Sequence, residues 1–142
     1  MPCSPFPGTA SREHLENLIS LGAKAGMNTL RIWGGGIYET DDFYDLCDKY
    51  GIMLLHDFMF ACGTYPDDDE DFVASFTREA EATVMRLRSH TCIACWVGNN
   101  ENGDGNDWDD PNTPNISLVG KVFRPILNRL DPRRHFRPSS PF

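Results

Sequence analysis

The chain has 142 residues, of which 40% are hydrophobic and 24% charged, and its formal net charge at pH 7 is −8. These values are typical of one globular domain with its own core. The acidic balance disfavours nucleic acid and anionic membrane surfaces as partners, because both bind clustered Lys and Arg. No apolar stretch approaches the ~20 residues of a membrane span. We recognise no signal peptide and expect a soluble protein of unknown compartment.

Helix and strand patterns alternate along the chain. Apolar residues at a helical period predict each helix, and short apolar runs that end on glycine or polar residues predict each strand. The predicted order is a helix capped by Ser11, a strand at 28–33, a helix from Thr40 or Asp41 to Gly51, a strand at 52–58, a helix at 72–89, a strand that runs from Cys92 towards Glu101, a helix at 116–130 interrupted by Pro125, and a strand beginning at His135.

This alternation predicts right-handed crossovers and a parallel sheet. Both a closed barrel and an open doubly wound sheet fit the pattern. The first strand favours the barrel, because Leu30 and Ile32 share one face whereas Arg31 lies on the other. An open sheet covered on both sides rarely buries an arginine, but the mouth of a closed parallel barrel, the TIM (β/α)8 barrel, can hold one.

The segment Cys-Ile-Ala-Cys-Trp-Val-Gly-Asn-Asn-Glu, residues 92–101, is an apolar run that ends on two amides and the carboxyl of Glu101. Parallel α/β proteins place their chemistry at such strand ends. Burying Glu101 behind Trp96 and Val97 without a use would be costly, so we expect a buried catalytic or ligand-binding carboxyl. A glycosidase needs such an acid to protonate the leaving oxygen, with Asn100 holding the neighbouring sugar hydroxyl. The alternative is a glutamate that caps the following loop.

Four further residues are candidates for substrate binding. Arg31 could orient carboxylates across the barrel, or form a structural ion pair. Trp33 could provide the apolar wall on which a sugar stacks, or belong to the core. Asp57 is expected as a hydrogen-bonding support among the substrate-binding residues at the barrel mouth. Trp108, within a long loop, is a candidate substrate lid, and packing against a helix is the alternative.

The five cysteines form no disulfide framework, since their number is odd. Cys92 and Cys95 are three apart on a predicted strand and face opposite sides, so they cannot pair or bind one metal there. Cys3, Cys47 and Cys62 are interpreted as small core or loop residues. We therefore expect no disulfide framework and no metal site formed by these cysteines.

Several blocks together resemble the catalytic domain of β-mannosidases in glycoside hydrolase family 2, over nearly the whole chain and in order. They are RIWGGGIYE at 31–39, DFYDLCD at 42–48, HDFMFAC at 56–62, YP at 65–66, GNNE at 98–101 and RPSSPF at 137–142. The Asn-Glu pair is common to a wider group of retaining barrel glycosidases. The Trp-Gly-Gly-Gly and Asp-Phe-Met-Phe-Ala-Cys blocks are more specific to the mannosidases.

The resemblance implies roles that spacing alone does not. Glu101 matches the general acid/base at the end of barrel strand four, and Asn100 matches the residue that contacts the sugar 2-hydroxyl. Trp33 and Trp108 match aromatic residues near the terminal mannose, and Arg31 matches an arginine beside the nucleophile. The implied reaction releases terminal β-D-mannosyl residues with retention and needs no cofactor.

One departure limits what the chain could do alone. The family's nucleophile is a second glutamate near the end of strand seven, and no residue here matches it. The resemblance places residues 1–142 in a single partial catalytic domain, roughly strands two to five of a TIM (β/α)8 barrel. The expected partners are a β-mannoside or oligosaccharide and the remainder of the same polypeptide, and we expect no turnover from the isolated chain. The alternatives are another family 2 exo-β-glycosidase, acting on a galactoside, glucuronide or glucosaminide, or a non-catalytic sugar-binding module.

Overall fold

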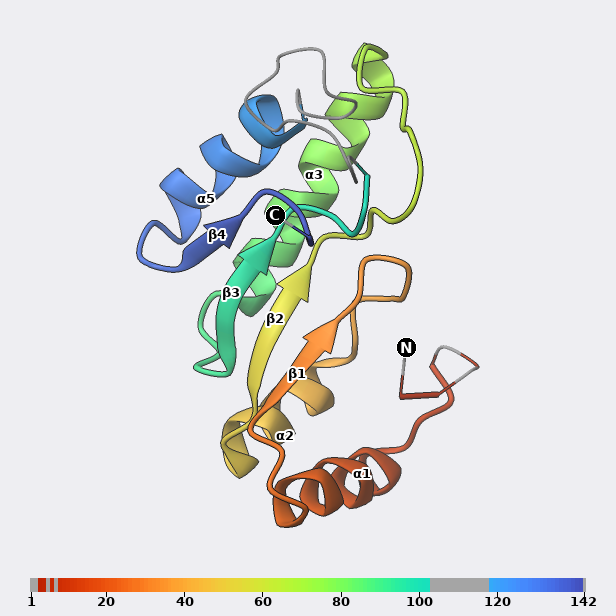
Figure 1. The fold of residues 1–142 in the computed structure, drawn as a ribbon, viewed down its shortest axis with the longest axis vertical. Coiled ribbons are helices and arrows are strands. Elements are labelled where there is room, and N and C mark those ends of the chain that lie inside the picture. The colour runs from red at the N-terminus through yellow and green to blue at the C-terminus, as the bar shows by residue number, and fades with distance from the viewer. Residues whose placement is uncertain (1–2, 5, 7, 103–117, 142) are drawn as a thin grey trace.

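The computed structural model describes residues 3–4, 6, 8–102 and 118–141. Its elements alternate as the sequence predicts (Figure 1). In chain order they are α1 (Arg12–Lys24), β1 (Thr29–Ile32), α2 (Asp41–Tyr50), β2 (Met53–Asp57), α3 (Glu70–Leu87), β3 (Ile93–Val97), the π-helical turn η1 (Val119–Phe123), α5 (Arg124–Leu130) and β4 (His135–Arg137). None of the described helices is both long and apolar enough to cross a bilayer.

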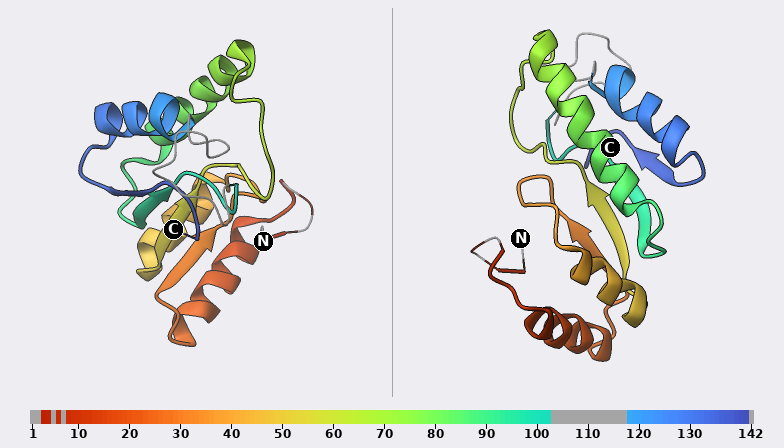
Figure 2. Two further views of the ribbon diagram at one scale, coloured as in Figure 1. Left: turned by 45° about the horizontal axis from the view of Figure 1, so that its top comes forward. Right: turned by 180° about the vertical axis from the view of Figure 1, so that it is seen from behind.

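The four described strands are all parallel and lie side by side in chain order, β1-β2-β3-β4. The helices α2 and α3 cover the same face of the sheet (Figure 2). A doubly wound sheet reverses its strand order at a switch point, and the described strands contain no reversal. This order is that of an arc of a (β/α)8 barrel, the architecture that the composition of the first strand favoured.

Local sequence signals set most helix ends. Ser11 caps α1, its hydroxyl oxygen accepting a hydrogen bond from the backbone N–H of His14 at 3.2 Å. Asp69 caps α3 in the same way with its carboxylate. Gly51 ends α2 with a φ of 70°, in the left-handed region that glycine tolerates. Thr40 is the N-cap of α2, but its side chain makes no capping hydrogen bond.

Two predicted elements differ from the structure. In the described part of the helix predicted at 116–130, a π-helical turn precedes α5, and Pro125 lies in the first turn of α5, where its missing N–H is not needed. The strand predicted to run towards Glu101 ends at Val97. Beyond it, isolated parallel bridges and single backbone hydrogen bonds connect residues 99–101 with the loops that follow β2 and β4. The candidate acid therefore lies in a loop after the strand rather than on it.

Aromatic side chains fill the core between the sheet and the helices α3 and η1. The ring of Phe58 stacks on Trp96 from β3 at 5.5 Å between centroids and on Phe123 from η1 at 4.7 Å. Phe76 of α3 packs edge-on against Phe60 at 4.3 Å. Each such fully buried side chain contributes about 1.5–3 kcal/mol by its removal from water. This packing fixes the C-terminal ends of β2 and β3 against the helices.

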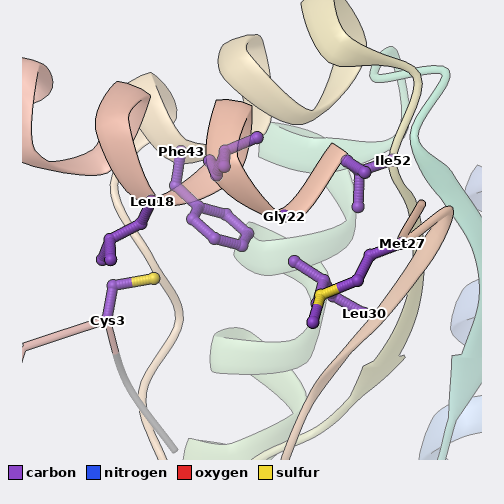
Figure 3. Close-up of a pocket in the computed structure, with 8 residues that line it drawn as sticks. Cys3, Leu18, Gly22, Met27, Leu30, Phe43 and Ile52 are labelled. Carbon is purple, nitrogen blue, oxygen red and sulfur yellow. The ribbon is translucent and has the colours of Figure 1, made fainter. Parts of the chain in front are cut away.

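An apolar cavity of about 180 Å³ lies between α1, β1 and α2 (Figure 3). Leu18, Met27, Leu30 and Phe43 are among the residues that line it. Leu30 therefore faces the helices, and its neighbour Arg31 points to the opposite face of the strand, as the alternation predicted. The cavity is thus on the helix side of the sheet, away from the polar groups described next.

Candidate active site

Polar side chains from β1, β2 and the loop after β3 form one hydrogen-bonded chain at the C-terminal end of the sheet. Arg31 on β1 donates from Nε to Oδ1 of Asp57 at 3.1 Å and from Nη2 to Oδ2 at 2.6 Å. The same Nη2 donates to Oδ1 of Asn100 at 3.1 Å. A planar guanidinium that grips a carboxylate with two bonds has a fixed orientation. Arg31 therefore connects the carboxylate of Asp57 to the side-chain amide of Asn100 and fixes the orientation of that amide.

The carboxylate of Asp57 is enclosed by protein groups. Its side chain is 0% exposed. Its Oδ2 also accepts the backbone N–H of Gly34 at 3.0 Å, so both carboxylate oxygens are used inside the protein. Burial raises the pKa of Asp57, whereas the hydrogen bonds and charge of Arg31 and the Gly34 N–H act in the opposite direction. This geometry fits the hydrogen-bonding support expected of Asp57, and its place among the substrate-binding residues stays a prediction.

The side-chain amide of Asn100 is oriented by its neighbours. Its Oδ1 accepts the bond from Arg31, which leaves the Nδ2 group to face away from the arginine. One Nδ2 contact is made with the sulfur of Cys62 at 3.5 Å. An amide nitrogen carries two N–H donors, so Asn100 can also donate to a ligand hydroxyl.

The main chain at Glu101 is held from both sides. Its backbone N–H donates to the carbonyl of Ser140, which follows β4, at 3.0 Å. Its φ of 59° lies in the left-handed region, which is uncommon for a residue with a side chain.

The expectation that Glu101 is buried is wrong: the residue is exposed in this chain. Trp96 and Val97, expected to cover it, are themselves buried in the core, and the indole Nε1 of Trp96 donates to Asp131 at 2.9 Å. The strand ends at Val97, so the residues after it leave the core. With Glu101 exposed, the described residues do not give its carboxyl the buried, apolar surroundings of a typical general acid.

Of the two tryptophans predicted to contact substrate, the structure describes Trp33. Its side chain is half-buried, and its ring packs on the turn that follows β1, since a Cβ added to Gly35 would lie 2.2 Å from the ring carbon Cη2. This glycine therefore allows the ring to lie flat against the main chain. Trp108 lies outside the described residues.

Sequence analysis did not assign Cys62 or Gly34 to the site. The sulfur of Cys62 lies 3.5 Å from Oε2 of Glu101, and Gly34 supplies the N–H that binds Asp57. Both residues lie in the Trp-Gly-Gly-Gly and Asp-Phe-Met-Phe-Ala-Cys blocks that carry the resemblance, but the blocks did not indicate these contacts. The parallel pairing of β2 and β3 brings the loops after residues 57 and 97 together, and this was a signal for Cys62.

A second group of polar residues lies at the opposite end of β3. One ligand atom each from Asp48, His90 and Cys92 lies within 4.8 Å of the others. Asp48 already accepts from Nδ1 of His90 at 2.7 Å, and from Thr91 Oγ1 and the Cys92 N–H. Burial raises the pKa of the Cys92 thiol, which disfavours the thiolate that binds metals. We interpret these contacts as a clamp that joins α2 to the start of β3.

Comparison with known proteins identifies the segment. The β-mannosidase of Capra hircus is 50% identical over 151 aligned residues, which cover 99% of this chain and 17% of that protein. The crystal structure of β-D-mannosidase from Dictyoglomus thermophilum matches all of this chain with a TM-score of 0.91 and 42% identity. Over its whole length this chain is similar in sequence and fold to one segment of these β-mannosidases. It spans about a sixth of the length of these relatives.

More distant proteins agree with this assignment. A β-mannosidase B of Thermothelomyces thermophilus is 34% identical over 157 aligned residues, which cover the whole chain and 18% of that protein. A β-glucuronidase of Bacteroides uniformis matches 89% of the chain at a TM-score of 0.71 but only 18% identity, which shows a shared fold alone. No protein-family model matches the chain. The fold of the described segment is that of four successive parallel strands of a TIM-barrel glycosidase, each preceded by a helix.

Proposed function

We propose that the complete polypeptide containing residues 1–142 hydrolyses terminal β-D-mannosyl residues and that Glu101 is its general acid/base. The observation that carries the proposal is the position of the Asn100–Glu101 pair. The pair lies just beyond the C-terminal end of β3 and is tied to the loops after β2 and β4. Strand ends on this side of a parallel barrel hold the catalytic groups of TIM-barrel enzymes.

In this proposal the described residues act in two ways. Glu101 gives a proton to the glycosidic oxygen as the bond to the sugar breaks, and later takes one from the attacking water. Asn100, whose amide is oriented by Arg31, donates to the hydroxyl next to the reacting carbon. Trp33 and, outside the described residues, Trp108 would line the terminal mannose subsite. Arg31 and Asp57 hold this arrangement in place.

The reaction needs a second carboxyl. Retaining glycosidases place their two carboxyl groups about 5–5.5 Å apart. Asp57 cannot serve, because it is fully buried and bound to Arg31. The nucleophile would therefore come from another part of the polypeptide, as would the rest of the catalytic domain. The isolated segment is accordingly expected to show no turnover.

The test compares two β-mannosides in the complete polypeptide. Glu101→Gln should lower kcat/KM for β-1,4-mannobiose by at least about 10³-fold, because its sugar leaving group must be protonated. It should leave kcat/KM for 2,4-dinitrophenyl β-mannoside within about tenfold, because that leaving group departs without an acid. Glu13→Gln, at an exposed position on α1, is the matched control and should change neither.

Three outcomes would contradict the proposal. Equal losses on the two substrates would show that Glu101 is not the acid. Faster hydrolysis of an aryl galactoside, glucuronide or glucosaminide than of the mannoside would place the polypeptide in another glycosidase class. Mannose binding by calorimetry, without hydrolysis and without an effect of Glu101→Gln on turnover, would indicate a sugar-binding module.

A further inference from the structure

Cys62 lies between the two groups to which the proposed function assigns the chemistry. Its Sγ is 3.5 Å from Oε2 of Glu101 and 3.5 Å from Nδ2 of Asn100. A thiol can donate one weak hydrogen bond and accept another at the same time. The sulfur is therefore placed to donate to the carboxylate and to accept from the amide.

The main chain, rather than the cysteine side chain alone, fixes this position. The Cys62 N–H donates to the carbonyl of Asn100 at 2.8 Å, and the Asn100 N–H donates to the carbonyl of Phe60 at 2.9 Å. These two bonds join the loop after β2 to the loop after β3, with the parallel bridge between Ala61 and Asn100. The distance between the sulfur and the carboxylate is thus set by the registration of the two loops.

The two residues that make this contact both have an unfavourable backbone conformation. The φ angles of Cys62 and Glu101 are 53° and 59°, and within the described ranges these are the two residues other than glycine with positive φ. The left-handed conformation costs a residue with a side chain roughly 1–3 kcal/mol, and such residues cluster at functional sites. Packing does not explain the conformation of Cys62, because the residue is exposed.

The thiol matters more to Glu101 than to Asn100. Asn100 has a second anchor in Arg31, which binds its Oδ1. For the Glu101 carboxylate, Cys62 is the side-chain hydrogen-bond partner that the described residues provide. Removing the sulfur should therefore release the carboxylate while the amide stays in place.

We infer that Cys62 is a positioning residue, whose thiol holds the Glu101 carboxylate where it can protonate the leaving group. The inference rests on the proposed function. It predicts a partial and selective version of the Glu101→Gln defect. The first step of hydrolysis should slow for leaving groups that need an acid and should be spared for those that do not.

The experiment uses the complete polypeptide and measures kcat/KM for β-1,4-mannobiose and for 2,4-dinitrophenyl β-mannoside. Cys62→Ala keeps the Cβ, so the backbone strain at this residue is unchanged. It should lower kcat/KM for mannobiose by about tenfold and for the activated mannoside by less than about twofold. Cys62→Ser restores a donor and an acceptor on a shorter bond and should lie between Cys62→Ala and the unchanged enzyme. Cys3→Ala, which removes a thiol from the apolar cavity of Figure 3, should change neither value.

A double-mutant cycle tests whether Cys62 acts through Glu101. In the Glu101→Gln background, Cys62→Ala should cause no further loss on mannobiose, because the group that it positions is already inactive. An equal loss on both substrates, no loss on either, or full additivity with Glu101→Gln would each overturn the inference. If Cys62→Ala does not fold, Cys62→Ser decides by the same substrate comparison.

Failure of the proposed function gives a different result. If the unchanged enzyme hydrolyses neither mannoside, or if Glu101→Gln lowers both rates equally, then the acid assignment fails and the role of Cys62 fails with it. If Glu101→Gln discriminates between the substrates and Cys62→Ala does not, the proposed function stands and only the role of Cys62 is overturned.

Discussion

Gly34 allows the closest main-chain approach at the candidate site, and Gly34→Ala should disrupt both folding and catalysis. A Cβ at this position would lie 2.2 Å from the carbonyl oxygen of Phe60 and 2.8 Å from that of Phe58. Ordinary contacts begin at about 3.4 Å, so the two segments would have to separate by about 1 Å. Both opposing atoms belong to the backbone, so no side chain can rotate away to make room.

The cost can be estimated from two effects. Overpacking typically costs about 1–3 kcal/mol, and the buried N–H of Gly34 would also lose its bond to Asp57, which is worth about 1–3 kcal/mol. We therefore expect Gly34→Ala to lower the free energy of unfolding by about 2–6 kcal/mol, the sum of the two ranges. The Phe60 carbonyl also binds the N–H of Asn100, so the displacement should reach Glu101. A shift of about 1 Å at catalytic groups costs on the order of 10²-fold in rate.

Urea unfolding and kcat/KM with 2,4-dinitrophenyl β-mannoside, both on the complete polypeptide, measure the two effects. Gly120→Ala is the matched control, because a Cβ at this position in η1 meets no atom within 4 Å. It should leave kcat/KM unchanged and alter the free energy of unfolding by less than about 1 kcal/mol. If Gly34→Ala were as well tolerated as Gly120→Ala, the close approach on which this reasoning depends would be refuted.

Two further substitutions test the role of Asp57 at the site and the burial of His56 in the core. Asp57→Asn removes the charge that holds Arg31 and should lower the free energy of unfolding by about 2–4 kcal/mol. It should also lower kcat/KM by more than tenfold, because Asn100 loses its anchor. The exposed Asp68→Asn is the control, and equal effects of the two substitutions would contradict this role. Burial lowers the pKa of His56 to about 3, so the unfolded chain, with a pKa near 6.5, takes up the proton first. Stability should then fall by about 1.4 kcal/mol per pH unit from about pH 6.5 towards pH 3. His56→Gln should flatten the stability curve between pH 7 and pH 5 by about 2 kcal/mol, and an unchanged slope would show that His56 is not buried in its neutral form.

Local chemistry made most of the fold predictable from the sequence. Ser11 and Gly51 act within one helical turn of their own positions, so a cap or a left-handed stop can be read without knowledge of the tertiary structure. The opposite faces of Leu30 and Arg31 follow from the alternation of a strand, and they indicated the barrel correctly. Strand ends were less predictable, because sheet pairing decides where they stop.

The details of the candidate site depend on long-range contacts and could not be predicted in the same way. Asp57 is remote in sequence from both Arg31 and Asn100, and its full burial follows from the packing of three neighbouring segments. The left-handed conformation of Glu101 results from its bond to Ser140, which a strand pattern does not reveal. The exposure of Glu101 was not predicted, because Glu101 was assumed to share the burial of Trp96 and Val97, although β3 ends at Val97.

The exposure of Glu101 separates two requirements of a general acid. Its position is set by contacts within the described arc of four strands, since its N–H binds Ser140 and its carboxylate contacts Cys62. The dry, apolar surroundings that make such a carboxyl effective are not supplied by these four strands. Under the proposed function, the residues that close the barrel beyond β1 and β4 would supply these surroundings together with the second carboxyl. On that proposal, the segment positions the proton donor and the rest of the polypeptide completes the site.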